Sequence, residues 1–403
     1  MNIFVHRASE CLTDHLPFGD GLISFSLLAE LANRGHRIFA YTNRDAVQNR
    51  PENLTIRARM HKVPANSLHP WEHGWRADRW LRELEREHTI DLVWRLQPYD
   101  IGCPTKPYTG GRPLVVGPLF YGWPCDTNSL SDLAKPRLGF GIRPLTIPLA
   151  KRGWARTLQD AALVICATDG LSRQIAPQTH GRVMTLPVIV DPPADFVHDR
   201  PTPAPTAAPR LLFAANLHRN KHPLVFCQTI LELRRMGLAA VGDILGDGQM
   251  RGELEHWCRE NSLADAIRFV GKVPNSEVYR RMTEADWLIS TSLGEPYGRS
   301  IIEAMSVGAV PICHRSGGPA DFIAHEKTGL LVDSLDGAVY AQAISRIWTK
   351  PGAWKNLSMA AMDQARQWNP KTIVDQLENA MLKLLPESPI AHATPLAVAG
   401  GGR

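Results

Sequence analysis

Short apolar runs and longer amphipathic segments alternate along most of the chain. In the first half, apolar runs at residues 2–5, 38–42, 91–95 and 113–117 predict buried strands, and residues 22–33 have the apolar spacing of an amphipathic helix. A strand, a glycine turn, a helix and a second strand in this order predict a parallel crossover unit. The pattern therefore indicates an α/β protein with parallel sheets.

The same order returns in the second half of the chain. Strands are predicted at 210–215, 242–245, 267–271, 287–289, 310–314 and 328–333, and helices at 223–236, 277–283, 336–349, 353–367 and 370–385. The segment between the halves contains six prolines, which predicts a linker. We therefore expect a first domain at 1–191, the linker at 192–209, a second domain at 210–368, a C-terminal helix at 369–385 and a disordered tail at 386–403.

The stretch from Ile289 to Gly308 concentrates the residues suited to chemistry. Its pattern is that of a strand end, a loop containing Pro296 and Gly298, and a helix start. A helix start presents free backbone N–H groups to an anion. Glu295 in the loop and Glu303 one turn into the helix add carboxylates, which accept hydrogen bonds from hydroxyls. Phosphate and hydroxyl binding together predict a sugar-nucleotide site; the alternative is two solvated surface glutamates.

This stretch resembles a known signature. Glu295 to Gly308 contains Glu-x7-Glu followed by Ala-Met-x-x-Gly, which resembles the retaining glycosyltransferases of family 4, in the glycogen-synthase and sucrose-synthase-like group. The resemblance implies the GT-B fold, in which two Rossmann-like, doubly wound parallel-sheet domains face a central cleft. It also implies an acceptor-binding first domain, a nucleotide-sugar-binding second domain and a C-terminal helix that crosses back to the first domain.

The resemblance gives the two carboxylates different roles. Glu295 would hold hydroxyls of the donor sugar, and Glu303 would hold the ribose hydroxyls. Transfer would retain the anomeric configuration by same-face attack of the acceptor, and a covalent intermediate on Glu295 is the less favoured alternative. Further donor-binding candidates surround the helix start: Tyr297, Gly298, Arg299 and Ser300.

The glycine turn of the first domain is the next candidate. Phe18-Gly-Asp-Gly21 lies between a strand and a helix, where such folds bring the backbone close to a ligand. By the resemblance, Gly19, Asp20 and Gly21 would contact the acceptor and the donor phosphates, and Asp20 would assist the acceptor. An ordinary tight turn is the alternative, because the spacing is not GxGxxG.

Cationic and glycine positions of the second domain complete the candidate site. Lys221 follows a strand at the start of a helix and matches the lysine of the family's Arg-x4-Lys pair, which contacts the diphosphate. Asn216 stands in place of the arginine, and Arg219 is a candidate substitute. Gly246 lies in a Gly-Asp-Gly turn that resembles the family's, and Val273 lies in the loop that reads the nucleobase there.

Two departures from common patterns bear on the chemistry. The chain contains no Asp-x-Asp, so we expect no metal at the diphosphate. Lys221, helped by Arg219 or Arg299 and by the helix start, would stabilise the leaving diphosphate instead. Many family members end a first-domain strand in a histidine, but Gly117-Pro118 stands here, as in a subgroup that carries Gly-Pro.

Composition places the chain among ordinary soluble enzymes, with 44% apolar and 21% charged residues. The chain has no apolar run that could span a bilayer and no signal-peptide pattern at its start. Seven scattered cysteines indicate reduced thiols and a cytoplasmic location. A net charge of +5 is too small to indicate nucleic-acid binding. The basic stretch 135–156 is a candidate for contact with an anionic membrane, but its prolines would break the required helix.

The sequence therefore predicts a metal-independent retaining glycosyltransferase with a nucleotide-sugar donor, UDP-sugar favoured, and no cofactor. The acceptor is open among a sugar, an aminocyclitol, a natural-product aglycone and a lipid. The alternatives are another GT-B enzyme, such as a phosphorylase or a sugar-nucleotide epimerase, and a silent sugar-nucleotide-binding protein. The presence of Glu295, Glu303 and Lys221 argues against the silent protein.

Overall fold

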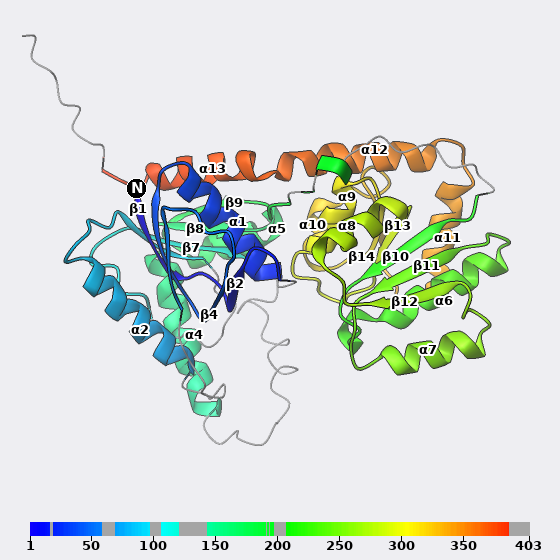
Figure 1. Ribbon diagram of the computed structural model, residues 1–403, viewed down its shortest axis with the longest axis horizontal. Helices are drawn as coiled ribbons and strands as arrows, with labels where there is room; N and C mark the ends of the chain where they lie inside the picture. The colour runs from blue at the N-terminus through cyan, green and yellow to red at the C-terminus, as the bar shows by residue number, and fades with distance from the viewer. Residues whose placement is uncertain are drawn as a thin grey trace, which may run out of the picture.

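Two parallel β-sheets, each with helices packed on both faces, form the two halves of the molecule (Figure 1). The computed structural model describes residues 1–16, 19–58, 69–96, 106–120, 143–190, 192, 194–196 and 207–386. The predicted doubly wound α/β architecture is confirmed.

The first sheet has seven parallel strands in the order β5-β3-β1-β6-β7-β8-β9. Their bounds are Asn2–Arg7 (β1), Arg37–Thr42 (β3), Leu54–Ala58 (β5), Leu92–Arg95 (β6), Leu114–Leu119 (β7), Leu163–Cys166 (β8) and Arg182–Thr185 (β9). The strand order reverses between β1 and β6, which are the central neighbours. Open α/β sheets bind ligands outside the carboxyl ends of the strands at such a reversal.

Alternating side chains of the first sheet build two core layers. Ile3 and Val5 of β1 pack in the same cluster as Gly19–Asn33 (α1), and Phe4 packs with His69–Leu84 (α2) on the other face. This alternation follows from the two-residue period of a strand. Two further helices complete the domain, Arg143–Asp160 (α4) and Asp169–Ile175 (α5).

The second sheet has six parallel strands in the order β12-β11-β10-β13-β14-β15. Their bounds are Arg210–Ala214 (β10), Val241–Leu245 (β11), Ile267–Gly271 (β12), Trp287–Ser290 (β13), Val310–His314 (β14) and Leu330–Val332 (β15). Its strand order reverses between β10 and β13. The helices are Pro223–Arg235 (α6), Arg251–Glu260 (α7), Asn275–Glu284 (α8), Arg299–Ser306 (α9), Gly317–Phe322 (α10), Gly337–Trp348 (α11) and Ala353–Ala365 (α12).

The last helix, Pro370–Leu382 (α13), lies along the first domain, whereas α12 lies over the second (Figure 1). Leu377 of α13 packs in the core cluster that contains α1. At the edge of this contact, Arg34 Nη1 donates to Glu378 at 2.8 Å, and His36 Nε2 lies 2.7 Å from the same carboxylate. The last described helix therefore lies on the domain in which the chain begins.

Two local features differ from the sequence pattern. Residues Cys11–Thr13 (β2), which were not predicted as a strand, are buried and pair with Arg44–Ala46 (β4). Pro144 and Pro148 do not interrupt α4. Pro144 is in the first turn, where its missing N–H would have no helical partner, and the helix also continues through Pro148. The tail from 387, the first part of 135–156 and much of the linker lie outside the described residues.

Candidate active site

A hollow of about 240 Å³ lies at the strand reversal of the second sheet. Its walls are the carboxyl ends of β10 and β13, the loop that follows each strand, and the first turn of α9. Predicted site residues among its lining are Asn216, Lys221, Glu295, Arg299 and Ser300. The structure therefore brings together, at the edge where such sheets bind ligands, residues that are up to 84 positions apart in sequence.

Lys221 and Glu295 face each other across this hollow. Lys221 Nζ donates to Glu295 Oε2 at 2.5 Å, and both side chains are largely buried. Lys221 lies in a short 3-10 helix, Arg219–Lys221, just before α6. The Thr291 hydroxyl donates to the carbonyl oxygens of Lys221 and His222 and ties this turn to the end of β13. The pair presents an ammonium to an anion and a carboxylate to hydroxyls.

The start of α9 adds uncapped backbone donors. Gly298 has a φ of 89°, a left-handed conformation that favours glycine, and no side chain caps the first turn. The N–H groups at such a start favour a phosphate. Glu303, one turn further, is 5% exposed and accepts from Arg299 Nε at 2.9 Å. Burial raises the pKa of Glu303, and the charge and hydrogen bond of Arg299 oppose that rise.

The loop that carries Glu295 is held by a segment that the sequence analysis did not select. Gly318 N donates to the Glu295 carbonyl oxygen at 2.9 Å, and Gly294 N donates to the Ser316 hydroxyl at 3.0 Å. A Cβ at Gly317 would lie 2.1 Å from that same carbonyl oxygen. The Gly-Gly pair after β14 was therefore the available signal, because only glycine permits this close approach.

The first domain reaches the hollow through the start of α1. Arg299 Nη1 donates to the Gly19 carbonyl oxygen at 3.4 Å. Asp20 keeps exposed surface, but the surrounding protein raises its pKa while the Arg299 charge opposes the rise. Gly21 is buried instead, and a Cβ there would lie 1.9 Å from the Cys11 carbonyl oxygen. Gly19 and Asp20 are thus at the interdomain site, whereas Gly21 serves the packing of α1 on β2.

Gly298 and Glu303 are not among the residues that line the hollow, and four further candidates also lie outside it. Arg219 is exposed on its 3-10 turn, and Val273 packs against the core after β12. Gly246 packs against the backbone at Ala215, with its N–H bonded to the Gly271 carbonyl oxygen. Tyr297 is buried, and its hydroxyl accepts from Val188 N at 2.8 Å, so its observed contact is an interdomain one.

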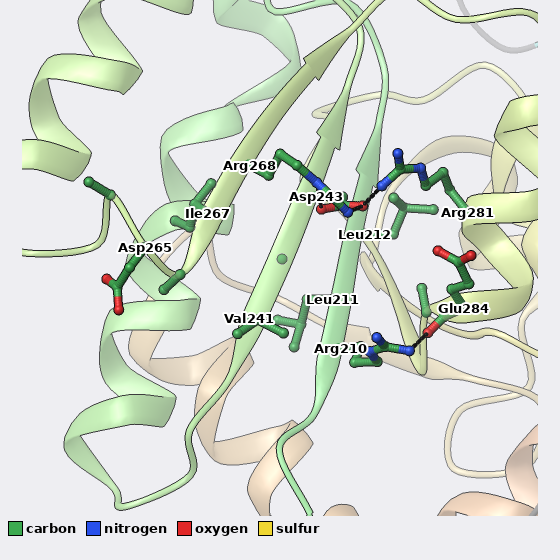
Figure 2. A pocket seen from close by; sticks show the side chains of 14 residues that line it. Arg210, Leu211, Leu212, Val241, Asp243, Asp265, Ile267, Arg268, Arg281 and Glu284 are labelled. Carbon is green, nitrogen blue, oxygen red and sulfur yellow. Dashed lines mark hydrogen bonds and ion pairs between the residues drawn. The ribbon is translucent and has the colours of Figure 1, made fainter.

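A larger hollow of about 460 Å³ lies elsewhere on the second domain (Figure 2). It lies at the amino ends of β10, β11 and β12, away from the edge where parallel sheets bind ligands. Figure 2 shows Arg268 and Arg281 both reaching Asp243, with nitrogen–oxygen distances of 2.7 Å. Arg268 and Arg281 are thus engaged by a carboxylate and Arg210 by the Glu284 carbonyl oxygen, so the smaller hollow is the better candidate for an anionic ligand.

Within the described segments, no group of three or more His, Cys, Asp or Glu side chains is arranged to hold a metal ion. In the same part of the chain, no helix combines the length and apolar character needed to cross a bilayer.

Comparison with known proteins defines the class to which this fold and site correspond. Residues 197–368 match the family model Glycosyl transferases group 1. Sucrose-phosphate synthase from Thermosynechococcus elongatus superimposes with a TM-score of 0.70 at 16% identity, covering 95% of this chain and 99% of that one. Alr3699/HepE from Anabaena, solved with UDP and glucose, gives 0.64 at 16% identity, covering 95% and 100%. The fold is GT-B, and the residues that match the family model make up the second domain.

The curated relatives are glycosyltransferases, and most of them are matched over less than half of their own length. The 2-deoxystreptamine glucosyltransferase of Streptomyces kanamyceticus is 26% identical over 309 residues, which are 72% of this chain and 73% of that one. The D-inositol 3-phosphate glycosyltransferase of Pseudarthrobacter chlorophenolicus is 29% identical over 160 residues, 39% of this chain and 38% of that one. Seven relatives, including the D-inositol 3-phosphate glycosyltransferase of Pseudarthrobacter chlorophenolicus, are matched over only 30% to 45% of their own length.

Proposed function

We propose that this protein is a retaining glycosyltransferase of family 4 that moves a sugar from a UDP-sugar to a small-molecule or glycan acceptor without a metal ion. The observation that carries the proposal is the Lys221–Glu295 pair beside the uncapped start of α9. A nucleotide sugar carries a diphosphate next to a polyhydroxyl ring, and the hollow offers complementary groups at one place. The complex of Alr3699/HepE with UDP and glucose supports UDP as the nucleotide.

In this proposal the chain's own residues stabilise the leaving group. Lys221 and the N–H groups of Arg299 and Ser300 meet the negative charge that develops on the diphosphate as the glycosidic bond breaks. When the donor binds, its phosphate replaces Glu295 as the partner of Lys221, and its hydroxyls replace Lys221 as the partner of Glu295. Glu303 holds the ribose hydroxyls, and Asp20, at the interdomain face, assists the acceptor hydroxyl.

The acceptor enters from the first domain. One relative is named for 2-deoxystreptamine, an aminocyclitol, and another for D-inositol 3-phosphate, a phosphorylated cyclitol. These two names support a cyclitol or sugar acceptor.

Thermal unfolding with UDP, GDP or ADP tests the proposal, each nucleotide with magnesium or with EDTA. Stabilisation by UDP that EDTA leaves unchanged is the expected result. Stabilisation that disappears with EDTA would contradict the metal-free mechanism. No stabilisation by any nucleotide would overturn the donor site and leave the phosphorylase alternative, which turns over only with inorganic phosphate.

A further inference from the structure

The guanidinium of Arg299 joins the donor hollow to a buried carboxylate. Arg299 is the first residue of α9 and one of the residues that line the hollow. Its Nε donates to Glu303 Oε1 at 2.9 Å, one helical turn further along. Glu303 is 5% exposed and does not line the hollow itself. The sequence predicts that Arg299 helps Lys221 at the diphosphate, yet this contact directs its charge toward Glu303.

The Glu303 carboxylate depends on this contact for its charge. A buried carboxylate is costly unless a cation and hydrogen bonds compensate. Burial raises the pKa of Glu303, and the charge and hydrogen bond of Arg299 oppose that rise. Helices α8 and α12 also contact α9, and charged side chains on them form ion pairs of their own: Glu277 with Arg280 and Arg281, and Asp363 with Arg366. Among the described residues, the charge that acts on the Glu303 carboxyl is that of Arg299.

A contact with the first domain holds the same guanidinium in place. Arg299 Nη1 donates to the Gly19 carbonyl oxygen at 3.4 Å, and the Arg299 charge opposes the rise that burial causes in the pKa of Asp20. Different nitrogens of one planar group thus face the two domains, and the side chain is only 21% exposed. A planar fork is fixed by such a pair of contacts, whereas a lysine would have a single nitrogen for both.

We infer that Arg299 is a positioning residue that acts through Glu303: it holds this buried carboxylate ready to accept hydrogen bonds from the ribose of a nucleoside diphosphate. The inference rests on the proposed function, in which Glu303 holds the ribose hydroxyls. An ionised carboxylate only accepts hydrogen bonds, whereas a protonated one also donates and accepts fewer. Hydrogen bonds to charged groups are also stronger than those between neutral groups. Ribose recognition therefore depends on the charge that Arg299 maintains.

Calorimetry on the full chain with UDP and 2′-deoxy-UDP tests this role, because the two nucleotides carry the same diphosphate and differ by one ribose hydroxyl. Their affinity ratio therefore cancels the titration of the phosphate itself. We expect the wild type to bind UDP at least about tenfold more tightly than 2′-deoxy-UDP, as for a hydrogen bond to a charged group. This ribose preference should fall as the pH is lowered and Glu303 takes up a proton.

Variants assign the preference to Arg299. In Arg299→Met the pH at which the preference is half lost should be higher than in the wild type, because burial of Glu303 is then unopposed. Arg299→Lys keeps the charge and should return this midpoint toward the wild-type value. Arg76→Met is the matched control, since Arg76 Nε donates to Glu72 Oε1 at the same distance of 2.9 Å on α2. It should change neither the preference nor its midpoint.

Lys221→Met separates this role from that of the diphosphate site, because it should weaken UDP and 2′-deoxy-UDP equally. An unchanged midpoint in folded Arg299→Met, or an equal loss of affinity for both nucleotides, would overturn the inference. If Arg299→Met does not fold, Arg299→Gln keeps a hydrogen-bond donor without the charge and should show the same raised midpoint. Failure of UDP to bind the wild type would contradict the proposed function. UDP binding without a ribose preference contradicts the inference and leaves the diphosphate site standing.

Discussion

Charged side chains at the hollow beside α9 already pair with one another, and a bound ligand would replace these contacts. Lys221 forms an ion pair with Glu295 at 2.5 Å, and Arg299 forms one with Glu303 at 2.9 Å. Each pair is partly buried, so an unpaired member would be costly. A nucleotide sugar restores the balance, because its phosphates and hydroxyls match the charges that it separates. The ion pairs thus hold the side chains in position before the donor binds.

Removing the ammonium should therefore reduce turnover much more than stability. We expect Lys221→Met to lower kcat with a UDP-sugar by about 10²- to 10³-fold, the usual loss for one electrostatic stabiliser of a developing negative charge. Lys350→Met, which removes an exposed lysine after α11, is the matched control and should keep full activity. Steady-state rates and melting curves of both variants make the comparison. A folded Lys221→Met variant with wild-type kcat would contradict the role of Lys221.

Buried His73 makes stability depend on pH in the first domain. Burial, then the charges of Arg7 and His6, hold its pKa well below 6.5 in the folded state, so the unfolded chain binds the proton more readily. Stability is therefore lost as the pH falls below 6.5. Urea unfolding should show a loss of roughly 1 kcal/mol from His73 between pH 7.5 and 5.5.

His73→Gln should remove this part of the pH dependence, since glutamine does not titrate. His256→Gln, at a side chain that is 66% exposed, should leave the pH dependence unchanged. Equal slopes for wild type and His73→Gln would show that His73 is not buried in neutral form.

At the scale of elements, the glycine segment after β14 supports the loop that carries Glu295. Gly317 has a φ of 60° and lies against the backbone of Glu295, whereas Gly352 has a φ of 74° with no atom near its missing side chain. Alanine should cost about 1–2 kcal/mol of stability at Gly352 for the left-handed backbone alone, and more at Gly317, where the Cβ would also overlap the Glu295 carbonyl oxygen.

Only Gly317→Ala should also lower activity, since its Cβ would displace the Glu295 loop. Paired measurements of melting temperature and kcat on Gly317→Ala and Gly352→Ala separate the two effects. If both variants lose stability and neither loses kcat, the segment does not position Glu295.

The burial pattern and the length of each strand explain why the sequence predicted some elements and missed others. Strands of the second sheet are buried on both faces, so their apolar runs stand out, and Val310–His314 is found where predicted. The edge strand Leu54–Ala58 alternates with exposed polar residues, and Cys11–Thr13 has only three residues, so neither gives a clear apolar signal. Local periodicity cannot reveal a strand whose partner is distant in sequence.

Some residues of the candidate site could likewise be predicted from the sequence, and others could not. Lys221, Glu295 and Arg299 could be selected because each stands in a local pattern, a strand end followed by a helix start, and the structure places all three in one hollow. The contact of Arg299 with the Gly19 carbonyl oxygen joins residues 280 positions apart, so no local pattern indicates it. The support of Glu295 by Gly318 was missed for the same reason, because it depends on the chain returning after β14.

At the scale of the whole molecule, a few polar contacts join the two domains around the site. Arg299 bonds the Gly19 carbonyl oxygen, Val188 N bonds Tyr297, and Gly170 N donates to Asp321 at 3.1 Å. Each contact pairs a backbone group of the first domain with a side chain of the second. Such contacts can be exchanged at low cost, which suits domains that close on a substrate.

An ion-pair cluster centred on Glu378 holds α13 against the first domain. Partial burial opposes ionisation of Glu378, but hydrogen bonds from Arg34 and His36 outweigh it and lower the pKa of the carboxyl below 4.5. The ionised form therefore stabilises the fold at all pH values above 4.5, and this contribution is lost as the pH falls through the folded-state pKa.

Glu378→Gln should lower the free energy of unfolding by about 1 kcal/mol at pH 7, a value reduced from that of a buried pair because both partners keep some exposure. The deficit should shrink toward zero by pH 3, where the wild-type carboxyl is also neutral. Glu260→Gln removes an ion pair whose side chains are 66% and 60% exposed, and should have no measurable effect at either pH. A deficit in Glu378→Gln that persists unchanged at pH 3 would show that packing of the side chain, and not its charge, holds α13 to α1.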